Sequence, residues 1–198
     1  DFAAIQVFEL PTFEQVGEWH HNTTPMNQQI RILQGINKHI YDTIMEQDAS
    51  ASPQIFYSME NNTIGEAALL RVMDIGEENI QGMFLSEPIR KGHRRKFRRG
   101  FNTTAKFKID ACTKFKELIE GGKMKINSQL LISELKDFVA SGLSFKAKPG
   151  QHDDLVSACL LMTRMMKVLA DFDPKIFEKW TDRTSELTPM PIFGSFTG

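Results

Sequence analysis

Short β-prone runs alternate with amphipathic helical segments along most of this chain, and this alternation limits the fold classes open to it. Residues 2–10 and 13–20 predict two antiparallel strands joined by a short turn. An amphipathic helix needs a sheet face on which to bury its apolar side, so a mixed β-sheet flanked by α-helices is expected. Helical spacing is found at 28–47, 61–74, 105–120, 128–139 and 152–171, and further β-prone runs lie at 54–60, 79–86, 123–127 and 143–148.

The size and composition of the chain fit one globular domain. It has 198 residues, of which 41% are hydrophobic and 25% charged. We expect residues 1–172 to form the domain and residues 173–198 to be a tail that packs on it or extends from it. The apolar run from Leu155 to Ala170 is interrupted by Arg164 and Lys167, and the N-terminus does not resemble a signal peptide. An intracellular protein without a membrane segment is therefore predicted.

The two cysteines, Cys112 and Cys159, are isolated from each other in the sequence. A disulfide framework or a thiolate zinc site needs more cysteines at closer spacing. Both are expected to be reduced, and no metal–thiolate chemistry is predicted.

Two adjacent carboxylates, Asp153 and Asp154, stand in "GQHDDLVSACLLM" where an apolar helix is expected to begin. One interpretation is helix capping, because acidic side chains interact favourably with the positive end of the helix dipole. The other is a divalent cation, which would remove the repulsion between the two charges and use both side chains as oxygen ligands. The first interpretation needs no further residue, whereas the second needs carboxylates from elsewhere.

A further carboxylate, Glu60, ends the β-prone run "QIFYSME". Ligands of α/β sheets usually bind at the edge where the carboxyl ends of parallel strands open. Glu60 is either an exposed loop residue beside a helix cap or a ligand that shares this edge with Asp153 and Asp154. The neighbouring histidines, His20, His21 and His152, would bind phosphate or water there, or are simply surface residues.

A basic run, "RKGHRRKFRRGFNTTAKFK", spans residues 90–108 and carries nine cations without an acid, with Phe97, Phe101 and Phe107 between them. A solvated loop is one interpretation. DNA phosphates are the other natural counter-charge, and such contacts hold a duplex without reading its sequence. The candidate DNA contacts are Arg90, Lys91, Arg94, Arg95, Lys96, Arg98, Arg99 and Lys106.

Three segments together resemble a known family. They are "FYSMENNTIGEAAL", "FNTTAKFKIDACTKFKELIEGGKMKIN" and "AKPGQHDDLVSACLLM". They are similar to the C-terminal nuclease domain of the terminase large subunit of tailed bacteriophages, over roughly residues 1–172. The resemblance implies an α/β, RNase H-like fold and a metal-dependent endonuclease that cuts double-stranded DNA during genome packaging in the host cytoplasm. It also implies an ATPase domain, a portal and a small terminase subunit as partners.

The resemblance also implies a site in which three acidic residues hold Mg²⁺ or Mn²⁺, as a two-metal centre. Glu60 matches the second acid of the family, and the Asp153–Asp154 pair supplies the third, with Asp154 preferred. Asp1 matches an auxiliary acid. The first acid is expected several residues before Asp1, on a strand between the runs 2–10 and 54–60. No GxxxxGK[ST] motif occurs, so the ATPase domain of the family is not expected within these residues.

Two rival functions remain open. Within the same fold, a Holliday-junction resolvase or a transposase would use similar carboxylates. From another class, a non-catalytic DNA-binding or docking module would retain the basic run without a complete metal site.

Overall fold

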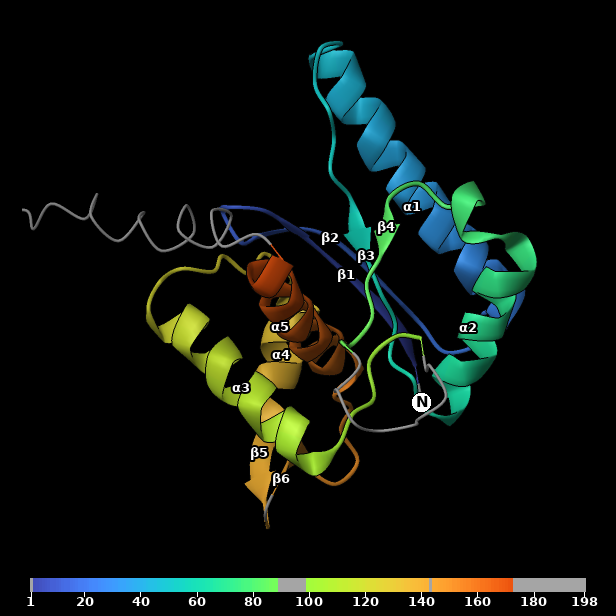
Figure 1. Ribbon diagram of the computed structural model, residues 1–198. Coiled ribbons are helices and arrows are strands. Elements are labelled where there is room, and N and C mark those ends of the chain that lie inside the picture. Colours follow the sequence, from blue (N-terminus) through green and yellow to red (C-terminus); the bar gives the residue numbers. More distant parts are fainter. Residues whose placement is uncertain (1, 89–98, 143, 173–198) are drawn as a thin grey trace, which may run out of the picture.

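The structure is a computed structural model and describes residues 2–88, 99–142 and 144–172 (Figure 1). An antiparallel hairpin comes first, and helices then alternate with short strands as predicted. The N-terminal elements are β1 (Ala3–Glu9), β2 (Glu14–His21), α1 (Met26–Gln47), β3 (Phe56–Tyr57), α2 (Thr63–Ile75), a 3₁₀ turn (Glu77–Asn79) and β4 (Met83–Phe84). They are followed by α3 (Ala105–Glu120), α4 (Gln129–Asp137), β5 (Phe138–Ser141), β6 (Ser144–Ala147) and α5 (Asp154–Phe172).

The strands of the described residues form three separate two-stranded ladders rather than one continuous sheet. β1 pairs with β2 and β5 with β6 in antiparallel fashion, whereas β3 and β4 are parallel. Antiparallel and parallel pairing thus both occur, as a mixed sheet requires. The strand expected at 123–127 is reduced to a single bridge between Glu14 and Lys125.

One predicted helix is shorter than expected. The helical pattern at 128–139 ends at Asp137, and Phe138 begins β5 instead. The Phe138 ring stacks on Phe145 of β6, with centroids 6.1 Å apart. Aromatic pairing across the hairpin therefore competes successfully with the helical periodicity. Residues 173–198, the predicted tail, lie outside the described residues.

The main hydrophobic core surrounds the first half of α5. Leu155, Val156 and Cys159 are at most 1% exposed, and they pack in a cluster with Phe115 of α3 and Leu131 of α4. Each such side chain contributes about 1.5 to 3 kcal/mol through burial. A smaller cluster joins α1, α2 and the β3–β4 pair through Ile30, Tyr57, Val72 and Ile80. The helix that carries the acidic pair is therefore held firmly from several sides.

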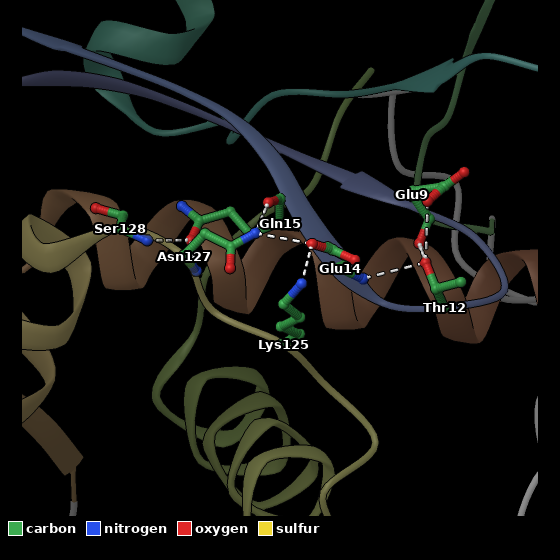
Figure 2. Close-up of polar contacts among 7 residues, drawn as sticks. All are labelled: Glu9, Thr12, Glu14, Gln15, Lys125, Asn127 and Ser128. Carbon is green, nitrogen blue, oxygen red and sulfur yellow. Dashed lines mark hydrogen bonds and ion pairs between the residues drawn. The ribbon is translucent and has the colours of Figure 1, made fainter.

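A buried glutamine, Gln15 of β2, fixes the segment that leads into α4 (Figure 2). Its side-chain oxygen accepts hydrogen bonds from the backbone amides of Asn127 and Ser128, each at 2.9 Å. The Ser128 hydroxyl in turn accepts from the Leu131 amide at 3.0 Å and caps α4. On the exposed side, Lys125 donates to Glu14 at 2.5 Å. These bonds set where α4 begins relative to the β1–β2 hairpin.

No helix in the described part of the chain is long and apolar enough to cross a bilayer. Both cysteines are free, as the sequence predicted.

Candidate functional site

The acidic pair lies at the start of α5, where Asp154 is the first helical residue. The amides of Leu155 and Val156 in this first turn donate to the carboxylate of Glu134, at 2.9 and 3.1 Å. Glu134 comes from α4, so a tertiary contact supplies the cap at these two amides. Glu134 thus takes the two amides that an Asp153 side chain could cap, whereas Asp154 remains in the first turn near the positive end of the helix dipole.

Each aspartate faces a nitrogen. The Lys108 ammonium of α3 donates to Asp153 at 3.3 Å, and the Lys108 and Asp153 side chains are only 20% and 29% exposed. The Nδ1 atom of His152 lies 3.8 Å from Asp154. An ion pair in such partial shelter is stronger than one on the open surface. The pair thus forms a small acidic corner that one lysine partly neutralises.

Glu60 follows β3 and is held by close backbone packing. Its segment pairs in parallel with Phe101, whose amide donates to the Met59 carbonyl at 3.1 Å while the Asn61 amide donates to the Phe101 carbonyl at 2.7 Å. A side chain at Gly65 would place its Cβ 1.7 Å from the Glu60 carbonyl oxygen. Only glycine permits this approach, because any side chain would collide with that oxygen.

One cavity connects Glu60 with the helices of the acidic corner. It has a volume of about 60 Å³, and Lys108 is among its lining residues, so this lysine touches both the Glu60 side and the Asp153 side. The other lining residues are Glu60, Thr103, Ala111, Ser157, Leu160, Leu161 and Arg164. Glu60 thus lines a cavity together with two cations, Lys108 and Arg164, and Lys108 links this cavity to Asp153.

Burial of the acidic corner changes the pKa of a carboxyl group next to the acidic pair. Burial raises the pKa of Glu134, and the charges of Asp154 and Asp153 raise it further, against the lowering effect of the two amide hydrogen bonds. Three carboxylates thus interact around the first turn of α5. Such repulsion is relieved by a cation, which is the property that a metal centre uses.

The donor chemistry fits Mg²⁺ or Mn²⁺, because Glu60, Asp153 and Asp154 provide oxygen atoms and Cys159 is buried in the core. Within residues 2–88, 99–142 and 144–172, however, no three His, Cys, Asp or Glu side chains lie together so as to hold an ion. Asp1, the predicted auxiliary acid, is outside the described residues. The described residues by themselves therefore do not form a complete ion-binding group.

Most of the predicted DNA contacts, from Arg90 to Arg98, lie outside the described residues. Arg99 forms an ion pair with Glu77, and Lys106 is exposed at the start of α3. The chain on the two sides of residues 89–98 is joined by a hydrogen bond, since the Glu87 amide donates to the Gly100 carbonyl at 3.2 Å. Phe101, the third described residue after that gap, pairs with the Glu60 segment, so the described part of the basic run begins beside Glu60.

The histidines have different surroundings. His152 is 53% exposed, and His21 is an exposed residue whose ring contacts the Thr24 hydroxyl at 2.7 Å. His20 is half-buried: its ring stacks on Phe2 at 4.3 Å, and its Nε2 atom is buried without a hydrogen-bond partner among the described residues. The same Phe2 ring meets His152 edge-on at 4.8 Å.

Comparison with solved structures identifies the fold. Two structures of the large terminase nuclease from thermophilic phage G20c, one with bound magnesium and one with bound cobalt, each match this chain with a TM-score of 0.54. The chain has the fold of a large terminase nuclease. Each match covers 83% of this chain and 74% of the phage nuclease at 16% sequence identity, and a scan against known protein families found no match. The predicted RNase H-like α/β fold is confirmed, and this likeness concerns the fold alone.

Sequence reasoning missed three residues of this region. Glu134 caps α5 from a different helix, Lys108 was read only as part of the basic run, and Arg164 only as an interruption of an apolar stretch. The distance along the chain explains each omission, because the partners of these residues are 21 to 77 positions away. A polar residue inside an apolar helix, as at Arg164, was the one available signal.

Proposed function

We propose that this chain is the nuclease domain of a phage terminase large subunit, a divalent-metal-dependent endonuclease that cleaves double-stranded DNA during genome packaging. The observation that carries the proposal is the acidic pair at the start of α5, where Glu134 caps the amides of Leu155 and Val156. Adjacent carboxylates that repel each other have a reason to persist there if they bind a cation. The terminase nuclease fold and the nearby Glu60 support the same function.

In this proposal Asp154 and Glu60 are the main metal ligands, with Asp153 and Asp1 in support. A pair of Mg²⁺ or Mn²⁺ ions would activate a water molecule and stabilise the leaving oxygen of the phosphodiester. The protein's own contribution is to hold these acids at one edge of the fold and to keep Lys108 beside them. The catalytic role of each acid rests on the site chemistry and on the family resemblance.

The remaining carboxylate of the set is proposed to come from a strand that pairs with β1 and β3. β1 pairs with β2 and β3 with β4, and the other edge of each has no ladder partner among the described residues. Unpaired inner strand edges cost stability, since their amides and carbonyls lose hydrogen bonds. A further strand carrying an aspartate would fill this position.

Double-stranded DNA is the proposed substrate, and the basic run of residues 90–106 is the proposed contact. Phe101 within this run pairs with the Glu60 segment, so phosphates bound at that point would lie near Glu60. We place the protein in the host cytoplasm, working with an ATPase domain, a portal and a small terminase subunit.

The deciding experiment is plasmid cleavage in Mn²⁺, comparing wild type with Asp154→Asn. Loss of a metal ligand is expected to reduce the cleavage rate by at least about a hundredfold, with little change in melting temperature because Asp154 is not a core residue. Asp171→Asn, which removes an exposed carboxylate from the far end of α5, is the matched control and should cut normally.

The alternatives give different results in the same assay. DNA binding without any cleavage by wild type would identify the non-catalytic module. A strong preference for four-way junctions over linear duplex would identify a resolvase. Normal cutting by Asp154→Asn would overturn the metal assignment.

A further inference from the structure

Arg164 of α5 is a cation held inside the fold. Its side chain is 12% exposed and forms an ion pair with Glu87. It also donates to the Asn102 carbonyl at 3.1 Å and to the Thr103 hydroxyl at 3.3 Å. One guanidinium group therefore binds the chain on both sides of residues 89–98. Its planar fork suits several simultaneous contacts of this kind.

Two aromatic rings complete the surroundings of this group. The guanidinium carbon lies 5.0 Å from the centroid of Phe101 and 4.9 Å from that of Phe107. Burial lowers the pKa of Arg164, and the charge of Glu87 opposes this effect. A cation that is desolvated, paired and in contact with aromatic faces holds its neighbours more firmly than a surface ion pair would.

These contacts lead directly to Glu60. Phe101, one of the two rings, pairs with the Glu60 segment through the hydrogen bonds to Met59 and Asn61. Arg164 also lines the cavity that contains Glu60. Because Arg164 belongs to the helix that begins at Asp154, it connects the two sides of the candidate site within the fold.

We propose that Arg164 is a positioning residue that fixes the Glu60 edge relative to the acidic pair of α5. It acts through the Phe101 ring, the Asn102 carbonyl and the Thr103 hydroxyl, and it does not itself contact DNA or metal. The predicted effect on metal binding rests on the proposed nuclease function, whereas the structural coupling does not. Loss of Arg164 should therefore loosen the Glu60–Phe101 pairing first, and weaken metal binding as a result.

The coupling is tested by hydrogen exchange in Arg164→Gln, with Lys167→Gln as the matched control. Lys167 is an exposed cation on the same helix, one turn away. The amides of Asn61 and Phe101 are expected to exchange about tenfold faster in Arg164→Gln and at the wild-type rate in the control. Uniformly faster exchange, including α1 and α4, would mean that Arg164 only stabilises the whole fold, and would overturn the proposal.

If Arg164→Gln does not fold, Glu87→Gln provides the second variant, since it removes the ion-pair partner and leaves α5 intact. The same local acceleration at Asn61 and Phe101 is expected there. Wild-type exchange at both amides in a folded variant would refute the coupling.

Metal affinity is then measured in the intact protein by the electron paramagnetic resonance of free Mn²⁺. Arg164→Gln should bind Mn²⁺ about tenfold more weakly, while its affinity for duplex DNA without metal stays within about twofold of wild type. Weaker DNA binding with unchanged Mn²⁺ affinity would make Arg164 a DNA contact and overturn the proposal. Absence of Mn²⁺ binding and cleavage in wild type would instead refute the proposed nuclease, leaving the exchange result to decide the coupling.

Discussion

The ammonium group of Lys108 lies 3.3 Å from the Asp153 carboxylate, and the same side chain lines the cavity that contains Glu60. One lysine thus contacts Asp153 and shares a cavity with Glu60, two of the carboxylates that the proposed function assigns to metal. Its positive charge lowers the repulsion between the carboxylates of the acidic corner. The same charge also weakens the attraction of these carboxylates for a divalent cation.

Lys108→Met should therefore bind Mn²⁺ more tightly. Two unit charges about 4 Å apart at an effective dielectric constant of about 20 interact by about 4 kcal/mol, and a divalent ion doubles this; solvent screening and a longer distance reduce it, so we expect about a tenfold gain in affinity. The Mn²⁺ affinity is obtained from the concentration of free Mn²⁺, measured by electron paramagnetic resonance. Lys114→Met, which removes an exposed cation of the same helix, is the control and should match wild type. Weaker binding in Lys108→Met would show that the lysine supports the metal site.

Replacing Arg94, Arg95 and Arg98 together with Ala should weaken DNA binding equally for unrelated sequences. Each lost phosphate contact is expected to reduce the log–log salt slope by about 0.9. Arg99→Ala is the informative comparison, because Arg99 is paired with Glu77 and should change the slope less than any of the other three. Fluorescence anisotropy of labelled duplexes over a salt series provides the measurement. An unchanged salt slope in the triple variant would mean that the basic run is a solvated loop that does not contact DNA.

Two glycine-to-alanine changes in helices should have opposite effects on stability. At Gly35 in α1 an added Cβ meets nothing within 4 Å, so Gly35→Ala should stabilise the fold by about 0.5 to 1 kcal/mol. At Gly65 in α2 the added Cβ would lie 1.7 Å from the Glu60 carbonyl, so Gly65→Ala should destabilise by about 1 to 3 kcal/mol. Urea unfolding measures both. Equal stabilisation by the two changes would mean that Glu60 is not held by this packing.

The raised pKa of Glu134, caused chiefly by burial, predicts a pH-dependent stability. From the ordinary glutamate value of 4.5 up to the raised pKa, the folded state binds more protons than the unfolded state. The contribution of Glu134 to the free energy of unfolding therefore falls as pH rises through this window. Glu134→Gln lacks this titration, so its stability relative to wild type should increase with pH across the window.

Urea unfolding of wild type and Glu134→Gln from about pH 4 to about pH 8 gives this difference directly. An Asp153→Asn background should move the change to lower pH, because one of the repelling charges is gone. A difference that is independent of pH would show that the Glu134 carboxyl titrates alike in the folded and unfolded chains.

Local patterns in the sequence determined where most helices lie and at which residue each of them begins. Asn62, Thr104 and Ser128 each accept a hydrogen bond from the amide three residues on, and each stands at the start of a helix with apolar residues at regular spacing. These signals act within one or two turns, so they are present in the sequence alone. They also placed Asp153 and Asp154 at the start of α5, and Glu60 after a strand.

Only the tertiary structure determined how these helices and strands contact one another. The Glu134 carboxylate reaches the first turn of α5 only because Gln15 sets the start of α4, and Lys108 reaches Asp153 only because α3 packs on α5. Strand length and pairing were likewise decided by neighbours, as at Phe138, which joins β5 instead of prolonging α4. Such contacts depend on the packing of segments distant in sequence, and residue spacing within one segment contains no information about them.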